Sequence, residues 1–222
     1  MAFTLAFDVY GTLVDPVEMR RHLDTLVGDE AESFGKLWHD KKVEYAFRRG
    51  LMEQYQDFGV CTLQALQYCL KVYQIEMTDT AQKELIAKLS QLKAFPDVLS
   101  GLKALKAGGH QLIAFSNGPE SAVRTLLDNA QILTQLDDVI SVDDVRTYKP
   151  SPRVYEYMIQ RTDTRPNSCW MISSNPWDVI GGKAAGLNAA WIQRNPAAVF
   201  DPCEFQPDRV VRNLIELSKH LK

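Results

Sequence analysis

The stretch FTLAFDVYGTLVD at residues 3–15 decides the fold, because a short apolar run ends abruptly at a carboxylate. Residues 3–7 are apolar almost throughout, which is typical of a strand buried on both faces of a parallel sheet. Asp8 follows directly, and a carboxylate there is costly to bury unless another group pairs with it. Gly11 allows a sharp turn, and Thr12 adds a hydroxyl. Asp8 is thus a candidate functional residue, with simple capping of a turn as the alternative.

Short apolar runs and helical patterns alternate in the second half of the chain. The runs resemble the first one in length and composition, and they lie at residues 111–115, 139–142, 169–172 and 189–192. Helical patterns occupy residues 120–130, 152–160 and 177–185. This alternation predicts an α/β fold with a doubly wound, Rossmann-like parallel sheet.

The segment between the first two apolar runs has a different pattern. It contains no strand-like run, and apolar residues recur in it at helical spacing, as at Leu63, Leu66 and Leu70. Phe95-Pro96 then marks the return to the alternating pattern. The pattern predicts an all-helical cap over the carboxyl edge of the sheet. We expect a core domain of residues 1–15 and 94–222 and a cap domain of residues 16–93.

Composition excludes several classes of protein. The 222 residues suffice for one core with a smaller insert, and the formal net charge of −3 comes without any basic run. We therefore expect no nucleic-acid partner. The four cysteines form no CxxC pair and suggest reduced thiols. Because no signal-peptide pattern and no apolar run of about 18 residues occurs, we expect a cytoplasmic protein that is not in a membrane.

Polar residues follow four of the predicted buried elements, at the edge where open parallel sheets bind ligands. Each group has a simpler interpretation, since Ser and Asn often cap helices and most lysines are solvated. A lysine beside a carboxylate, however, keeps that carboxylate ionised. Together the four ends place a nucleophilic carboxylate, a lysine and several hydrogen-bond donors around one point. They are Asp8–Thr12, Ser116–Gly118, Tyr148–Pro150 and Ser173–Asp178.

These four segments, in this order, resemble the HAD superfamily, and more narrowly the L-2-haloacid dehalogenases. The resemblance covers nearly the whole chain and implies a hydrolase acting on a small-molecule carboxylate, often as a homodimer. The matching stretches are FDVYGTLVD at 7–15, FSNG at 115–118, YKPSPRVYEY at 148–157 and SSNPWD at 173–178, with LWHDKKVEYAFRRGLM at 37–52 resembling the family's cap helix.

The resemblance implies a two-step reaction. Asp8 attacks C2 of a short 2-haloalkanoic acid and inverts it, and water then hydrolyses the ester to give a 2-hydroxy acid. Lys149 would keep Asp8 anionic. The remaining catalytic positions, which would orient Asp8, Lys149 and the water, are Thr12, Ser173, Asn175 and Asp178. The substrate positions are Tyr10, Ser116, Asn117, Phe58, Tyr155 and Trp177, where core packing is an alternative role for Phe58 and Trp177.

Two positions argue against phosphoryl transfer. HAD phosphatases need an acid–base Asp two residues after the nucleophile, where this chain has Tyr10. They also carry an acidic Mg²⁺ ligand at a position that is Ser174 here. Mg²⁺ is usually held by carboxylates, so we expect neither a metal nor another cofactor.

The match breaks in the cap, where the family has Arg-Gln and this chain has His39-Asp40. A protonated His39 can meet a halide, but its charge fades as the pH rises. Asp40 could pair with His39, face solvent, or recognise a cationic substrate. The last option makes ring opening of L-azetidine-2-carboxylate an alternative reaction. A catalytically silent HAD-fold binding protein is a further alternative, against which the intact Asp8, Lys149 and Asp178 argue.

Overall fold

The computed structural model describes residues 2–221, so the outer ends of the predicted core domain, residues 1 and 222, lie outside it. Within these residues, six strands form one parallel sheet in the order β3-β2-β1-β4-β5-β6. The strands are β1 (Thr4–Phe7), β2 (Gln111–Ser116), β3 (Asp138–Ser141), β4 (Cys169–Ser173), β5 (Asn188–Ile192) and β6 (Arg209–Val211).

The five predicted strands are confirmed, and the ends of each lie within one residue of the prediction. The edge strand β6 was not predicted, because it has only three residues and the first two are exposed. A strand of this kind lacks the continuous apolar run that marks the buried strands. The predicted α/β class and parallel sheet are therefore correct, with one short strand added at the edge.

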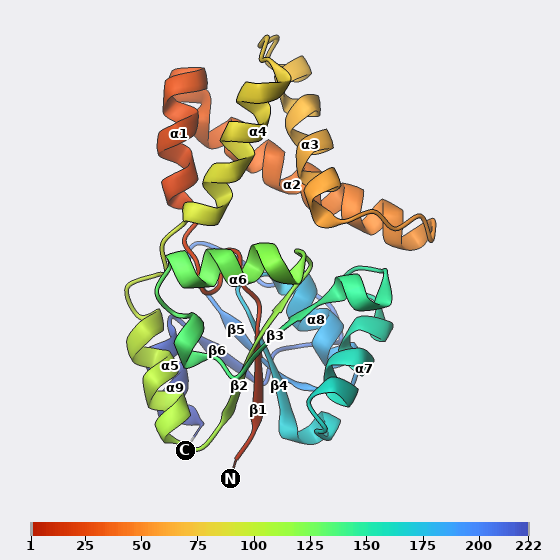
Figure 1. Cartoon of the computed structure of the whole chain (residues 1–222). Helices are drawn as coiled ribbons and strands as arrows, with labels where there is room; N and C mark the ends of the chain where they lie inside the picture. The colour runs from red at the N-terminus through yellow and green to blue at the C-terminus, as the bar shows by residue number, and fades with distance from the viewer. Residues whose placement is uncertain (1, 222) are drawn as a thin grey trace.

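Successive side chains of β1 pack alternately into two separate hydrophobic clusters, one on each face of the sheet. Leu5 and Phe7 belong to one cluster, and Ala6 belongs to the other. Figure 1 shows the helices that cover the sheet on both sides. The first cluster takes side chains from α5 (Val98–Ala107), α6 (Glu120–Asn129) and α9 (Leu214–His220), and the second takes them from α7 (Pro152–Arg161) and α8 (Pro176–Ala184). Coverage of both faces explains why the strands are apolar almost throughout.

Four helices lie together beyond the carboxyl ends of the strands (Figure 1). They are α1 (Val17–Val27), α2 (Ala31–Leu51), α3 (Phe58–Val72) and α4 (Asp79–Ala87), and we call this block the cap. The chain enters and leaves the cap through two segments that run side by side. The Asp15 N–H donates to the Lys93 carbonyl at 2.8 Å, and Val14 forms an antiparallel bridge with Ala94. The two connections therefore tie the base of the cap to the core.

Candidate active site

The central strands β1 and β4 lie side by side where the strand order changes direction, the point at which doubly wound sheets bind ligands. Asp8 follows β1, and Asn175 follows β4. Between them Gly11 adopts φ +79°, a conformation that side chains with a Cβ rarely adopt. A Cβ on Gly11 would also lie 3.3 Å from Ser174 Oγ. This turn brings Thr12 back toward Asp8.

The two carboxylate oxygens of Asp8 have different surroundings. Oδ2 accepts hydrogen bonds from Asn175 Nδ2 at 2.8 Å and from Thr12 Oγ1 at 3.0 Å. Oδ1 accepts none from residues 2–221 and lies 3.5 Å from Lys149 Nζ. Asp8 is only 7% exposed, and it lines a small cavity. Oδ1 is therefore the oxygen that is free to react.

Lys149 is fully buried and has fixed partners. Its ammonium donates to the Phe115 carbonyl at 2.7 Å and to Asp178 Oδ2 at 2.9 Å, and it lies 4.3 Å from the centroid of the Phe115 ring. Its backbone N–H donates to Asn117 Oδ1 at 3.0 Å. The ammonium thus stands between two carboxylates in one orientation, and Asp8 is the more distant of them.

Asp178 and Tyr155 support this lysine from the far side. The Tyr155 hydroxyl donates to Asp178 Oδ1 at 2.8 Å, and both residues are fully buried. Burial raises the pKa of Asp178 to about 6, although the attraction of Lys149 opposes the rise. Burial, followed by the charge of Asp178, raises the pKa of Tyr155 well above its usual value, so Tyr155 stays a donor. Close packing fixes this group, since a Cβ on Gly181 would lie 2.4 Å from Tyr155 Oη.

Two predicted hydroxyls support the loops at the strand ends. Ser173 Oγ accepts from the Asn175 N–H at 3.1 Å, and Ser116 Oγ accepts from the Gly118 N–H at 3.1 Å. Ser174, at the position of the phosphatase metal ligand, lies instead beside Thr12, with the two hydroxyl oxygens 3.1 Å apart. Across residues 2–221, no three His, Cys, Asp or Glu side chains gather in a metal-binding group.

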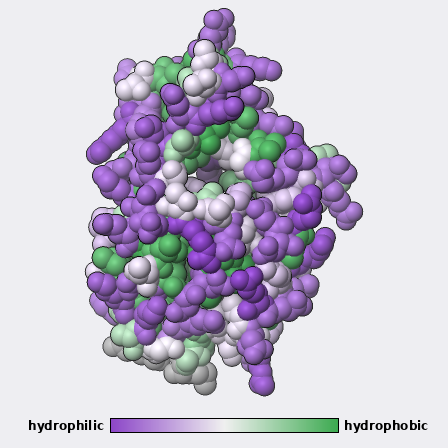
Figure 2. Space-filling model, in the orientation of Figure 1, coloured by the Kyte–Doolittle hydropathy of each residue, from purple (hydrophilic) through white to green (hydrophobic). Residues whose placement is uncertain are grey.

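A cavity of about 70 Å³ lies beside Asp8, between the core and the cap, and we call it the chamber. It is lined from the core by Asp8, Tyr10, Ser116, Asn117, Asn175 and Trp177, and from the cap side by His39, Lys42, Val43, Phe58, Thr62 and Leu89. An open cavity of about 450 Å³, which we call the vestibule, adjoins it and shares Tyr10, His39, Lys42, Leu89 and Asn175 with it. Figure 2 shows the surface hollowed between cap and core, with hydrophobic residues at the edge of the hollow.

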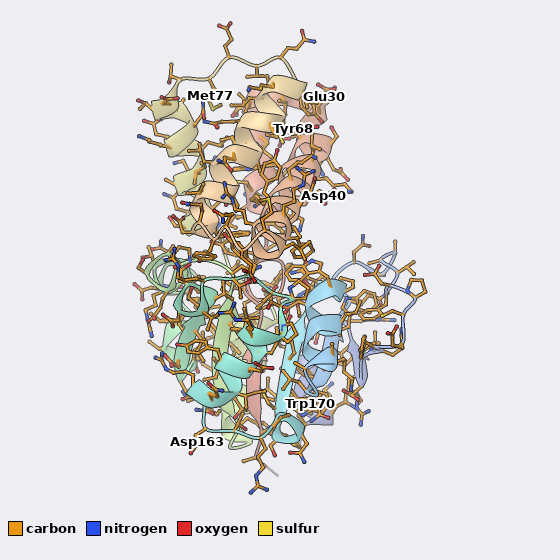
Figure 3. The ribbon with its side chains drawn as sticks, turned by 90° about the vertical axis from the view of Figure 1, so that its right-hand side faces the viewer. Glu30, Asp40, Tyr68, Met77, Asp163 and Trp170 are labelled. Carbon is orange, nitrogen blue, oxygen red and sulfur yellow. The ribbon has the colours of Figure 1, made fainter. Side chains whose placement is uncertain are left out.

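Two residues predicted to bind substrate do not line the chamber. Asp40 is exposed on the outer side of α2, where it pairs with Lys36 at 2.5 Å (Figure 3). Successive residues of a helix point about 100° apart, so Asp40 faces away when His39 faces the chamber. Tyr155 lies beneath the chamber and contacts Asp178 instead. The other predicted substrate positions, Tyr10, His39, Phe58, Ser116, Asn117 and Trp177, all line the chamber.

Sequence reasoning missed Lys42, which follows His39 by three residues and therefore lies on the same face of α2. Burial lowers the pKa of Lys42 to about 8. The pKa of His39 falls to about 4, through desolvation in the cleft and then through repulsion from Lys42. His39 is an exposed residue, and any lowering of its pKa from the usual 6.5 leaves the imidazole neutral near pH 7. The charged group on the cap side of the chamber is therefore Lys42.

The fold and the site together define a class of protein. It is a protein with a doubly wound parallel α/β sheet and a helical cap, in which an aspartate follows the first strand and a buried lysine lies 3.5 Å from it. The chain belongs to the haloacid dehalogenase-like hydrolases, whose family profile matches residues 4–186.

Individual relatives cover nearly the whole chain. The chain is 35% identical to (S)-2-haloacid dehalogenase 4A of Burkholderia cepacia, over 95% of this chain and 91% of that protein. It is 34% identical to haloacetate dehalogenase H-2 of Moraxella sp. (strain B), over 93% and 92% of the two chains. Among solved structures, L-2-haloacid dehalogenase from Xanthobacter autotrophicus with chloropropionic acid covalently bound gives a TM-score of 0.93 at 26% identity, and the match covers 99% of this chain and 98% of that one.

Proposed function

We propose that this protein is a hydrolase that displaces the halogen from C2 of a short 2-haloalkanoic acid with inversion, forming an ester on Asp8. The observation that carries the proposal is the unequal environment of the Asp8 oxygens. Oδ2 holds two donated hydrogen bonds, whereas Oδ1 has none from residues 2–221 and belongs to a residue that lines the chamber. Oδ1 therefore attacks C2, while the Lys149 ammonium 3.5 Å away offsets the negative charge of the carboxylate.

The same two donors serve the second step. Once Oδ1 is esterified, Oδ2 becomes the carbonyl oxygen of the ester. Water adds to the carboxyl carbon of Asp8, and negative charge develops on Oδ2. Asn175 Nδ2 at 2.8 Å and Thr12 Oγ1 at 3.0 Å already point to that oxygen, as the donors of an oxyanion hole do. Asp178, Tyr155 and Ser173 act as positioning residues through Lys149 and Asn175.

The size of the chamber favours a small substrate. The chamber of about 70 Å³ exceeds the roughly 15 Å³ that a single water requires, but it is small enough to hold only a small ligand. A 2-halopropionate has about six non-hydrogen atoms and fits this limit. Ser116 and Asn117 place polar groups on the core side, where they can hold the substrate carboxylate. The covalent chloropropionic adduct of the Xanthobacter relative is of the same size class.

The two alternative functions have less support. The hypothesis that the protein opens the ring of L-azetidine-2-carboxylate depended on Asp40 as the partner of a cationic substrate. Asp40 is exposed and paired with Lys36, so this observation no longer favours it. A silent binding protein does not require a nucleophile, and the ordered contacts of Asp8 and Lys149 therefore favour an enzyme.

The decisive experiment is a single turnover with excess enzyme in ¹⁸O-labelled water. We expect halide and proton release from L-2-chloropropionate, inverted product, and unlabelled first-turnover product, because the first oxygen comes from Asp8. Mass spectrometry of the peptide containing Asp8 should then show one ¹⁸O. EDTA should have no effect. Label in the first product would overturn the ester mechanism, and no halide from L- or D-2-haloacids or fluoroacetate would overturn the activity.

We also propose a cytoplasmic homodimer. Within residues 2–221 no helix has the length and apolar character needed to cross a bilayer. The four cysteines are free, and three of them are buried, which fits a reducing compartment. Leu51 and Met52, at 87% and 58% exposure, form an apolar end of α2 that suits a subunit contact. Light scattering of the purified protein tests the dimer, and a monomer at micromolar concentration would contradict it.

A further inference from the structure

The ammonium of Lys42, on α2, has no counter-ion among the residues that the structure describes. Its neighbours on the same helix, Lys36 and Lys41, pair with Asp40 and Glu44 at 2.5 and 2.7 Å. Lys42 forms no hydrogen bond or ion pair with residues 2–221, and its ammonium lies 5.2 Å from the centroid of the Trp38 ring. A half-buried ammonium without a counter-ion is costly for the fold, which points to a role of Lys42 beyond folding.

The position of Lys42 indicates that role. Lys42 lines both the chamber and the vestibule, so it lies where the two cavities meet. Among the described residues that line the chamber, it is the one lysine or arginine, and Asp8 is the one carboxylate. Asp8 approaches the chamber from the core, and Lys42 approaches it from the cap. A group expelled by Asp8 leaves on the side opposite the attack, which an in-line displacement requires.

His39 does not supply a second positive charge. It lines the same two cavities, but its imidazole is neutral near pH 7, in part because the Lys42 ammonium repels its proton. Lys149 is not a candidate either, since its ammonium is held by Asp178 and the Phe115 carbonyl on the other side of Asp8. Among the residues that the structure describes, the free cation lining the chamber is thus Lys42.

We propose that Lys42 receives the anion displaced from C2 at the junction of chamber and vestibule, an inference that rests on the proposed function. The bond from Asp8 Oδ1 to C2 forms while the bond from C2 to the halogen breaks. The electron pair leaves with the halogen as halide, to which the Lys42 ammonium donates a hydrogen bond. A positive charge where negative charge develops stabilises the transition state. The same charge repels an azetidinium, so Lys42 selects an anionic leaving group.

The first test compares turnover of L-2-chloropropionate and L-2-bromopropionate in Lys42→Met, Lys42→Gln and Lys42→Arg. We expect both neutral variants to lose kcat on the order of 10²-fold, as for removal of one transition-state donor, with the larger loss for chloride and little change in KM. Lys42→Arg should keep most of the activity. Lys41→Met is the matched control, because Lys41 lies next to Lys42, pairs with Glu44 and lines neither cavity.

The second test needs no turnover. Of the four tryptophans, Trp38 lies beside the Lys42 ammonium and Trp177 lines the chamber, so iodide bound there should quench part of the tryptophan fluorescence. We expect a saturable component of iodide quenching in the wild type and in Lys41→Met, and only linear collisional quenching in Lys42→Met and Lys42→Gln. Circular dichroism of each variant checks that it is folded.

The outcomes separate the inference from the proposed function. Wild-type kcat in both neutral variants would overturn the role of Lys42, as would linear quenching in the wild type. An equal rise in KM for both substrates, with kcat unchanged, would also overturn it, because Lys42 would then bind the substrate carboxylate rather than the leaving group. A wild type that releases no halide from any 2-haloacid, yet shows saturable quenching lost in Lys42→Met, would sink the proposed function and leave an anion site at Lys42.

Discussion

The core and the cap each contribute one lysine to the active site, and the two lysines are held in opposite ways. Lys149 in the core is fully buried, contacts two carboxylates and donates to a carbonyl. Lys42 in the cap lies over the Trp38 ring and forms no ion pair or hydrogen bond with residues 2–221. The core therefore fixes its charges in advance, which holds the proposed nucleophile in one orientation. The cap leaves the Lys42 ammonium without a counter-ion, which suits the binding of an anion that is present only during the reaction.

The largest effect should come from removing the nucleophile on the core side. Asp8→Asn should lower halide release by at least about 10⁴-fold, since loss of a nucleophile removes the covalent route. Asp40→Asn is the control, because Asp40 is exposed and outside the chamber, and it should behave as the wild type. Activity in Asp8→Asn above one percent of wild type would break the assignment, and an inactive Asp40→Asn would return Asp40 to the site.

The second effect tests whether the core lysine is truly locked. Lys149→Met leaves Asp178 buried without its counter-ion, and breaking such a pair costs about 3 kcal/mol. The free energy of unfolding in urea should fall by that amount at pH 7. The double variant with Asp178→Asn should recover part of the loss, because only Asp8 is then left without the lysine, and Asp178 no longer carries a buried charge. An unchanged free energy of unfolding in Lys149→Met would show that the core charges are as loosely held as that of Lys42.

A third, smaller effect tests the packing behind the core lysine. In Gly181→Ala the new Cβ would lie 2.4 Å from Tyr155 Oη and 2.7 Å from Pro150 Cβ. Relieving this overlap should cost about 2 kcal/mol of stability and should weaken the contact between Tyr155 and Asp178. Gly50→Ala is the matched control, since its Cβ would meet Thr147 Oγ1 at an ordinary 3.6 Å. Equal stability of the two variants would contradict the close packing of this group.

The contrast between core and cap also explains what the sequence predicted. Asp8, Thr12, Asn175 and Asp178 follow buried strands, and parallel strands bring their ends to one edge whatever the loops do. In the cap, the residues that face the site depend on how α2 is rotated, and packing in the cap decides this. Predicting substrate contacts from His39-Asp40 as a pair overlooked that adjacent helical residues diverge. The i, i+3 spacing of His39 and Lys42 was the signal that would have found Lys42.

The short and partly exposed elements were missed for a different reason. Helix α9 packs against α5 on one face of the sheet, and the edge strand β6 lies beside β5. Strand β6 has three residues and α9 has seven, so neither is long enough for a clear periodic pattern. Their structure follows from tertiary contacts, which a local pattern does not report.

The smallest expected effect is on stability and depends on pH. Replacing Lys42 should raise the free energy of unfolding, whereas replacing Lys149 should lower it. The pKa of Lys42 is about 8 in the folded protein and 10.5 in its ordinary state. Burial raises the pKa of the neighbouring Cys69 thiol to about 11, and His39 is neutral, so neither supplies a counter-charge near pH 8. Below pH 8 the folded and unfolded chains both carry the ammonium, and the fold bears the full cost of burying it. Lys42→Met should therefore stabilise the protein by about 1 kcal/mol at pH 7.

Between pH 8 and 10.5 the unfolded chain binds the extra proton, so the stability contributed by the wild-type lysine rises with pH. The advantage of Lys42→Met should shrink across that window and vanish near its upper end. Urea unfolding at pH 7, 9 and 10 measures this difference, and Lys41→Met, whose lysine pairs with Glu44, should show no such gain. A Lys42→Met variant that is less stable than the wild type at pH 7 would mean that Lys42 is held as firmly as Lys149, and the contrast between core and cap would fail.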